Sequence, residues 1–196
     1  FDREVAMRTV FSTLVVLFGF ASAGNAAEMI DVGPDVGTNI PANFNGQDAK
    51  GKDITYADVT GERGLVLGFV RSASWCPFCQ SQMKDLENIA ADLKSRGYEL
   101  AVMSYDAPKV LDQFAKKQNI SYALLSDEGS EMINALGIRE TSYKEDSMAY
   151  GVPKPVIFII DPNGKIEGKL AMEGYRDRPA LEEVMAEVDR IIGANS

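Results

Sequence analysis

The chain has 196 residues, 45% of them hydrophobic and 25% charged, which suits one globular domain with a single core. Its formal net charge is −9 and its basic residues form no run, which excludes nucleic acid as a partner because phosphate binding requires clustered Lys and Arg. It contains no histidine, which excludes Ser–His and Cys–His nucleophiles, His-ligated zinc or copper, and haem held by imidazole.

The amino terminus has the residue order of a secretory signal peptide. Arg8 follows Met7, an apolar stretch runs from Val10 to Phe20, and small residues occupy 21–27. A charged start, an apolar centre and a small-residue cleavage site are typical of an exported protein. The apolar stretch is shorter than the roughly 20 residues that span a bilayer, which disfavours an uncleaved membrane anchor. A buried core helix is the other alternative.

We therefore expect two parts in the chain. Residues 1–26 comprise a few residues upstream of a start at Met7 and the signal peptide itself, cleaved after Ala23 or Ala26. Residues 27–196 form the exported domain, and the periplasm is its expected location.

The domain alternates strand and helix patterns, after a Gly-, Asn- and Pro-rich segment over 31–52 that predicts loop and a short edge hairpin. Strands are expected at 64–70, 98–104 and 122–126, and in a hairpin that begins at 155. Helices are expected from Pro77 to a stop at Gly97, and over 110–118, 131–136 and 181–192. A polar excursion covers 139–150. This order predicts an α/β layer fold with a mixed sheet.

The two cysteines of the chain lie three positions apart in "SASWCPFCQSQM", where the first long helix follows a buried strand. Pro77 suits the first helical turn because its missing N–H is not needed there. Cys76 then lies at or beside the N-cap, where the positive pole of the helix stabilises a thiolate and lowers the pKa of the Cys76 thiol. The spacing predicts that Cys76 is reactive near neutral pH.

Cys79 lies on the apolar side of that helix. The apolar stripe consists of Cys79, Met83, Leu86, Ile89, Ala90 and Leu93, while the opposite side carries Gln82, Lys84, Asp85, Glu87 and Asp92. We expect Cys76 to be an exposed attacking thiol and Cys79 a shielded resolving thiol. One helical turn also brings the two α-carbons within disulfide range.

Two other roles for the pair are less favoured. A zinc site needs about four ligands, and two cysteines without histidine would require carboxylates or a second subunit. A purely structural disulfide would close a loop of only a few residues, so it would add little stability. A redox pair is favoured, and it needs neither metal nor cofactor.

"WCPFC" at a junction of strand and helix resembles the active site of the thioredoxin-like superfamily. "LLSDEGSEMINALGI" and "GVPKPVIFIIDPNGKI" resemble the redoxin branch, the alkyl hydroperoxide reductase and thiol-specific antioxidant (AhpC/TSA) proteins and their periplasmic or membrane-tethered relatives. The resemblance covers about residues 36–192. It implies a three-layer thioredoxin-like sandwich, with Cys76 as nucleophile, Cys79 as resolving cysteine, and Trp75, Pro77 and Phe78 supporting them.

The resemblance also implies a cis-proline opposite the dithiol. Pro153 and Pro155 are the candidates, and the spacing to Asp161 and Gly164 favours Pro155. Lys154 would then present its backbone to a bound partner. An ordinary proline at the start of a strand is the alternative reading of Pro155.

The chain departs from the peroxiredoxins at two positions ahead of the cysteine. Their proline and peroxide-positioning threonine are replaced by Phe69 and Ala73, and Ser72 or Ser74 could substitute only with a shift in geometry. Efficient peroxide reduction is therefore not expected.

Three functional hypotheses follow. The leading one is an exported thiol-disulfide oxidoreductase acting on protein thiols or disulfides with a recycling thiol reductant or oxidant. The second is a thiol peroxidase, in which a hydroperoxide oxidises Cys76 to a sulfenic acid that condenses with Cys79. The third is a binding domain with an inert disulfide. Arg71 and Arg139 could approach the thiolate, but surface roles are favoured for both.

Overall fold

The computed structural model describes residues 28–195, so the expected signal peptide over 1–26 lies outside the described residues. The described chain contains, in order, β1 (Asn45–Asp48), β2 (Asp53–Thr55), α1 (Tyr56–Val59), β3 (Gly64–Phe69), α2 (Pro77–Ser95), β4 (Tyr98–Ser104), α3 (Pro108–Gln118), β5 (Ala123–Ser126), α4 (Glu131–Ala135), β6 (Val156–Ile160), β7 (Ile166–Leu170) and α5 (Leu181–Ala194).

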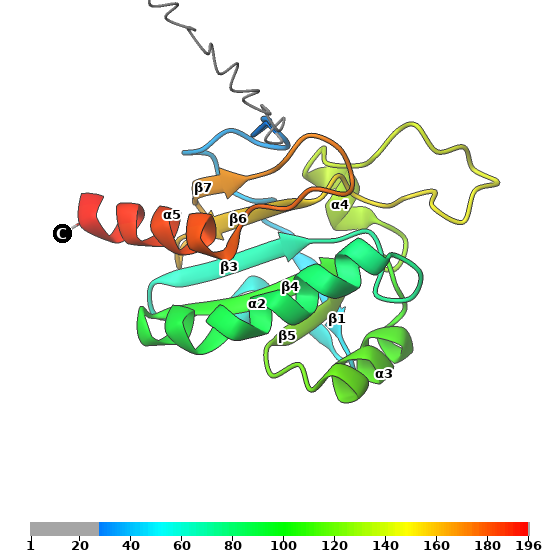
Figure 1. Cartoon of the computed structure of the whole chain (residues 1–196), viewed down its shortest axis with the longest axis horizontal. Helices are drawn as coiled ribbons and strands as arrows, with labels where there is room; N and C mark the ends of the chain where they lie inside the picture. Colours follow the sequence, from blue (N-terminus) through cyan, green and yellow to red (C-terminus); the bar gives the residue numbers. More distant parts are fainter. Residues whose placement is uncertain (1–27, 196) are drawn as a thin grey trace, which may run out of the picture.

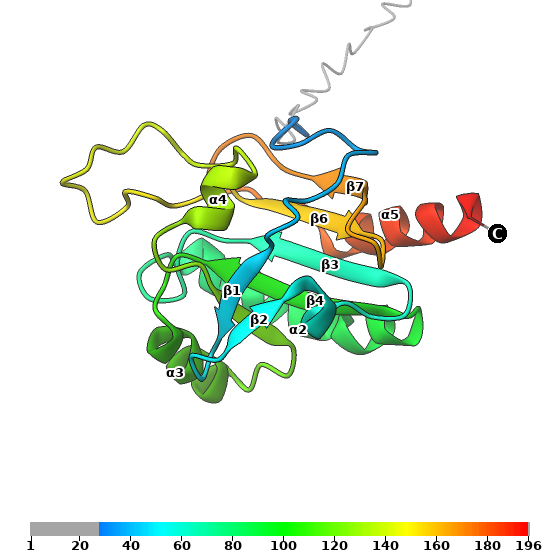
Figure 2. The same ribbon diagram turned by 180° about the vertical axis from the view of Figure 1, so that it is seen from behind.

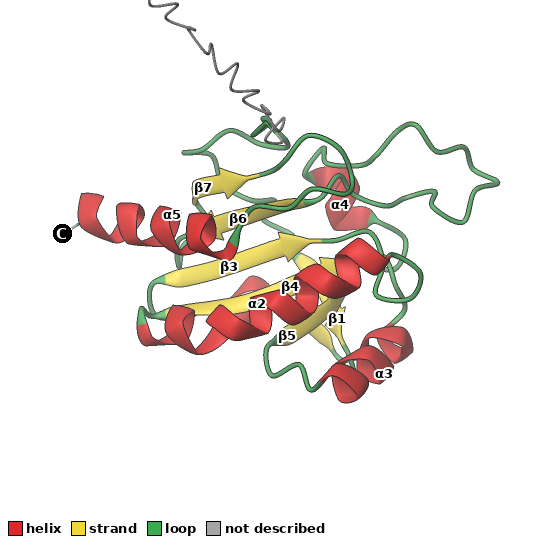
Figure 3. Ribbon diagram, viewed as in Figure 1, coloured by secondary structure: helices red, strands yellow, loops and turns green. Residues whose placement is uncertain are grey.

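The strands form one mixed sheet in the order β2-β1-β5-β4-β3-β6-β7 (Figure 3). β3, β4 and β5 are parallel to one another, while β6 and β7 on one side and β1 and β2 on the other are antiparallel to their neighbours. The central strands thus need helical crossovers, which α2 and α3 supply, and the edges are hairpins. The mixed α/β fold expected from the sequence is confirmed.

Helices cover both faces of this sheet. α2, α3 and α5 pack on one face, where their apolar side chains share a core with Val66 and Val70. α4, α1 and the segment before β1 pack on the other face against Leu65, Leu67 and Phe69. Figures 1 and 2 show the two layers from opposite sides. Alternate residues of β3 therefore enter two different cores, which explains why its sequence is an unbroken apolar run.

β3 must begin with a glycine because it passes close to β6. Gly64 has a φ of +136°, and a Cβ there would collide with the carbonyl oxygen of Ile160. At the end of α2, Gly97 has a φ of +83° and ends the helix where the sequence indicated.

The helix α1 was not anticipated, because it is one turn of four residues with none buried. Its start is fixed by Asp58, whose carboxylate accepts from both the backbone N–H and the hydroxyl of Thr55, each at 2.7 Å. The edge hairpin is confirmed, with its second strand at 53–55, just beyond the predicted segment. Within residues 28–195, none of the helices is both long enough and apolar enough to cross a membrane.

Candidate active site

Three loops meet beyond the carboxyl end of β3: residues 70–76, which lead into α2, residues 136–155 between α4 and β6, and residues 171–180 between β7 and α5 (Figure 1). Parallel strands end at the same edge of a sheet, so loops that follow them supply most sites of α/β proteins. Both cysteines belong to this region.

Cys76 is the N-cap of α2 and Pro77 its first residue, as the sequence indicated. Cys76 and Cys79 are joined by a disulfide, with their α-carbons 5.2 Å apart. The backbone N–H of Cys79 donates to Cys76 Sγ at 3.3 Å, so one of the unpaired amides of the first turn is directed at this sulfur. The same amide is placed to stabilise a Cys76 thiolate once the disulfide is reduced.

The expected exposure of Cys76 is wrong for this disulfide form. Cys76 is 2% exposed and Cys79 0%. Bonding to Cys79 draws the sulfur of Cys76 toward the apolar side of α2, where Cys79 packs with Met83. The exposed groups at this end of the helix are Pro77 and Phe78 instead. A reaction partner must therefore move side chains to reach the disulfide.

The loop before α2 is fixed by one buried carboxylate. Asp106 accepts from the hydroxyl of Ser72 at 2.7 Å, from the backbone N–H of Ala73 at 2.6 Å and from the hydroxyl of Ser104 at 2.7 Å. Ser72 Oγ in turn accepts from the backbone N–H groups of Ser74 and Trp75. The Ser72 hydroxyl is thus oriented toward Asp106 and the loop backbone.

Arg178, which the sequence did not single out, contacts the buried cysteine. Its Nη2 lies 3.6 Å from Cys79 Sγ, and its Nε donates to Gln82 Oε1 at 2.5 Å. Its Nη1 donates to the carbonyl oxygens of Tyr175 and Asp177. Burial, and next the positive charge of Arg71, lower the pKa of Arg178 to about 10, so it remains charged at neutral pH. A thiolate on Cys79 would offset that buried charge.

Gln82 was expected on the solvent side of α2, and the structure contradicts this. Gln82 is 6% exposed because Arg178 in the 171–180 loop covers it and takes its side-chain oxygen as an acceptor. The helical pattern alone does not reveal a loop that packs over the polar side.

Arg71 was expected at the surface and is instead 6% exposed. Its guanidinium lies over the rings of Trp75, Tyr143 and Tyr175, at 4.9, 5.3 and 4.7 Å from their centroids. Its Nη2 donates to the Tyr143 hydroxyl at 2.7 Å. Aromatic rings from three loops therefore hold one cation beside the dithiol. Arg139 lies against Tyr150 and is half-buried, farther out in the 136–155 loop.

Trp75 connects the dithiol loop to the 136–155 loop. Its Nε1 donates to the hydroxyl of Tyr105 at 2.9 Å, and that hydroxyl donates to the carbonyl oxygen of Met148 at 2.7 Å. Phe78 is 39% exposed and its ring meets that of Tyr175 edge to face at 6.0 Å between centroids. The supporting aromatic residues expected from the sequence thus lie around the disulfide.

The cis-proline expectation is wrong. No peptide bond among residues 28–195 is cis, so Pro155 is a trans proline directly before β6, the ordinary strand-start position. The backbone N–H of Lys154 donates to the carbonyl oxygen of Ile138, just after α4, at 2.7 Å. This N–H is therefore not free for a partner. Lys154 and Pro155 nevertheless line the same cavity as Arg71 and Tyr175.

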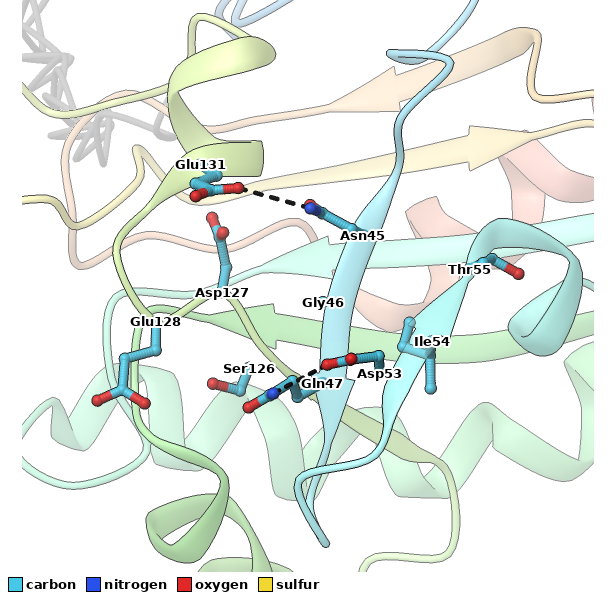
Figure 4. A pocket seen from close by; sticks show the side chains of 10 residues that line it. All are labelled: Asn45, Gly46, Gln47, Asp53, Ile54, Thr55, Ser126, Asp127, Glu128 and Glu131. Carbon is cyan, nitrogen blue, oxygen red and sulfur yellow. Dashed lines mark hydrogen bonds between the residues drawn. The ribbon is translucent and has the colours of Figure 1, made fainter.

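A larger cavity of about 530 Å³ lies between β1, β2 and the loop after β5 (Figure 4). Three of its four acidic side chains are engaged, since Asp127 accepts from the backbone of α4, Glu131 from Asn45 and Asp53 from Gln47. The fourth, Glu128, is exposed. It contains neither cysteine. Among residues 28–195, no cluster of Cys, Asp or Glu could hold a metal ion.

Comparison with known proteins identifies the family. The profile of the AhpC/TSA family matches residues 36–169, more than half of the chain. The chain belongs to the AhpC/TSA family. Peroxiredoxin Bcp of Escherichia coli K12 is 30% identical over 130 residues, which cover 66% of this chain and 81% of Bcp. The thiol-disulfide oxidoreductase ResA of Bacillus thuringiensis is 25% identical over 155 residues, 79% of each protein.

Solved structures confirm the thioredoxin-like redoxin fold. Peroxiredoxin 6 of Arenicola marina matches 84% of this chain and 76% of its own with a TM-score of 0.74 and 19% identity. Peroxidoxin BcpB of Mycobacterium tuberculosis matches 85% of this chain and all of its own with a TM-score of 0.67 and 19% identity. The two curated relatives make this AhpC/TSA protein a thiol-disulfide oxidoreductase or a thiol peroxidase.

The sequence did not predict four residues of the site: Arg178, Tyr143, Tyr175 and Asp106. Each reaches the dithiol loop from far along the chain, as Ser72 to Asp106 (34 residues) and Cys79 to Arg178 (99 residues) show. One signal was available, because arginine and tyrosine occur together in the otherwise unassigned "EGYRDR" before the last helix.

Proposed function

We propose that this AhpC/TSA protein is an exported thiol-disulfide oxidoreductase in which Cys76 is the nucleophile and Cys79 the resolving cysteine. In the reduced protein, the Cys76 thiolate attacks a substrate disulfide. A bond forms between Cys76 Sγ and one substrate sulfur, and the other substrate sulfur leaves as a thiolate. Cys79 then attacks Cys76 Sγ and releases the second substrate thiol. The substrate gains two electrons and two protons, and the Cys76–Cys79 disulfide forms. The reverse sequence oxidises a dithiol.

The observation that carries this proposal is the absence of a peroxide-positioning hydroxyl three residues before Cys76. Ala73 occupies that position, is buried, and gives its backbone N–H to Asp106. The neighbouring hydroxyl of Ser72 donates to the same carboxylate. The one hydroxyl that this loop orients, that of Ser72, is thus directed at Asp106 and not at a hydroperoxide. Disulfide exchange needs only the two sulfurs and the amides of the helix.

A thiol peroxidase is the second candidate, favoured by the family and by the 30% identity to peroxiredoxin Bcp. In that case the Cys76 thiolate attacks the peroxide O–O bond, becomes a sulfenic acid and releases water or an alcohol. Cys79 then condenses with the sulfenic acid, releasing a second molecule of water.

The two functions are separated by stopped-flow measurement of the Trp75 fluorescence of the reduced protein. We expect oxidised insulin or a small disulfide to react at least a hundredfold faster than hydrogen peroxide. Cys79→Ser should accumulate the mixed disulfide, detectable by mass, and Cys76→Ser should not react. Faster oxidation by hydrogen peroxide would establish the peroxidase instead. A disulfide that fails to equilibrate with glutathione buffers would support the inert binding domain.

Export is proposed from the order of charged, apolar and small residues over 7–27. The test is expression of the full chain in a Gram-negative host, followed by cell fractionation and intact mass measurement. We expect the periplasmic fraction to contain a product shortened to begin at Gly24 or Ala27. A full-length product in the cytoplasm or membrane fraction would contradict the proposal.

A further inference from the structure

A cavity of about 320 Å³ lies beside the dithiol, between the loops that surround it. Its walls come from the 70–76 loop after β3, the 136–155 loop, the 171–180 loop and Ile30 of the segment before β1. The lining residues that matter here are Arg71, Glu140, Ser142, Tyr143, Lys154 and Tyr175. The volume suits the end group of a small molecule or one amino-acid side chain.

Arg71 brings an uncompensated charge to this cavity. Across residues 28–195, no carboxylate lies within 4 Å of its guanidinium, and Nε, which is fully buried, has no hydrogen-bond partner. Its one polar contact is the Tyr143 hydroxyl. Burying a guanidinium without an anion is costly, and aromatic rings offset only part of that cost. The arrangement is that of a site whose anion comes from outside the protein.

The remaining charges of the lining agree with an anionic ligand. Lys154 adds a second cation, and its side chain is exposed. Glu140 is the acidic residue of the lining, and its carboxylate is engaged by the backbone N–H of Ser142 at 2.9 Å. That hydrogen bond, with smaller contributions from Lys154 and Arg71, lowers the pKa of Glu140. Two cations and one anion leave a positive cavity on a protein with a net charge of −9.

Side chains of the cavity wall contact residues of the redox centre. Tyr175 lines it, stacks edge to face with Phe78 of the cysteine motif, and accepts from Arg178 through its carbonyl oxygen. Arg178 in turn contacts Cys79 Sγ. Trp75, which precedes Cys76, lies under the Arg71 guanidinium. Neither cysteine lines the cavity, but Trp75 and Phe78, which contact its walls, directly precede Cys76 and Cys79 in the chain.

We propose that this cavity binds the carboxylate of the substrate disulfide or thiol, with Arg71 as the anion-binding residue. This inference rests on the proposed oxidoreductase function and adds a substrate class to it. The planar guanidinium suits a carboxylate, and the hydroxyl groups of Tyr143 and Ser142 lie in the same lining. The rings of Tyr143 and Tyr175 contact the apolar part of the ligand. Such a site selects disulfides that carry a carboxylate a few bonds from the sulfur.

Binding can be tested without any redox step. Trp75 is the single tryptophan of the chain and lies against Arg71, so its fluorescence reports on the site. We expect suberate to change the fluorescence of the oxidised protein saturably, and suberamide, its neutral analogue, to bind about tenfold more weakly or not at all. Equal binding of the two would overturn the proposal.

Two variants with the same change of charge assign the effect. Arg71→Gln should weaken suberate binding by about tenfold or more. Arg63→Gln is the matched control, because Arg63 is exposed and precedes β3, whereas Arg71 follows that strand. Suberate affinity that falls equally in both variants, or in neither, would overturn the role of Arg71. Circular dichroism monitors folding, and the ligand pair on the unaltered protein tests the site if Arg71→Gln does not fold.

Turnover then tests the substrate class. 3,3′-Dithiodipropionate and its diamide differ only in charge, and a peptide disulfide with glutamate or glutamine beside the cysteine makes a second pair. We expect kcat/KM to favour the acid in at least one pair by about tenfold, through KM, and Arg71→Gln to remove the preference. A preference in the first pair indicates a small-molecule carboxylate, and a preference in the second pair indicates a carboxylate of a protein. Equal rates in both pairs overturn the inference while the proposed function stands. No reaction with any disulfide refutes the proposed function, and suberate binding still decides the site.

Discussion

The contact between Arg178 and Cys79 sets the chemistry of a buried sulfur. Cys79 is fully buried, and burial alone opposes the thiolate that must leave when the disulfide is opened. A guanidinium nitrogen 3.6 Å from Cys79 Sγ stabilises that thiolate and gives nothing comparable to the neutral disulfide. Arg178 therefore favours the reduced state of the pair.

Arg178→Gln should lower the reduction potential of the Cys76–Cys79 pair. Loss of a hydrogen bond to a charged group destabilises the reduced state by on the order of 1–2 kcal/mol. For a two-electron couple this lowers the reduction potential by about 20–40 mV. Equilibration with glutathione buffers, read by the mass of alkylated protein, measures the shift. Arg178→Lys should recover part of it, and Arg190→Gln, on the exposed side of α5, should leave the potential unchanged. An unchanged or raised potential in Arg178→Gln would contradict this role.

At the scale of elements, the position of Cys76 depends on how the loop between β3 and α2 is held. Asp106, two residues after the end of β4, accepts three hydrogen bonds from Ser72, Ala73 and Ser104, and its own carbonyl oxygen accepts from the Ser126 hydroxyl. The carboxyl ends of β3, β4 and β5 are thus tied together beneath the cysteine loop.

Asp106→Asn should reduce the free energy of unfolding by about 2 kcal/mol. An amide nitrogen cannot accept a hydrogen bond, so one of the three donors that face Asp106 loses its partner in a buried place. Urea denaturation followed by circular dichroism measures the change. Asp112→Asn is the control, because Asp112 pairs with Lys116 on the exposed side of α3. If both variants were equally stable, the Asp106 network would not anchor the loop.

For the whole molecule, the disulfide is a small part of what holds the fold together. Two continuous cores flank the sheet, and the disulfide closes a loop of only three-residue separation at one end of α2. Restriction of the unfolded chain by so short a loop contributes on the order of 2 kcal/mol or less. A redox pair requires this property, because both states must stay folded.

The reduced protein should therefore unfold cooperatively, with a free energy of unfolding within about 2 kcal/mol of the oxidised protein. Urea denaturation with and without dithiothreitol compares the two states, and the double variant Cys76→Ser/Cys79→Ser provides a form that cannot reoxidise. A loss above about 4 kcal/mol, or loss of cooperativity, would indicate a structural disulfide.

Local sequence was sufficient for most elements and for the cysteine helix. β4 was predicted at its observed bounds, and β3 and the helices α2 to α5 within about two residues, because their apolar periodicity is strong. The N-cap position of Cys76 and the burial of Cys79 followed from Pro77 and the apolar stripe. The one-turn helix α1 was missed because four residues, none of them fully buried, carry no periodic signal.

The sequence by itself determined the layered α/β fold, the redox-capable spacing of the cysteines and the acidic net charge, since each depends on neighbouring residues or on composition. Only the tertiary structure decided that Cys76 is covered in the disulfide form, that Pro155 is trans, that Arg71 and Gln82 are buried, and that Arg178 contacts Cys79. These facts depend on loops far apart in the chain that meet at the ends of parallel strands. No local pattern encodes which side chain of one loop covers another.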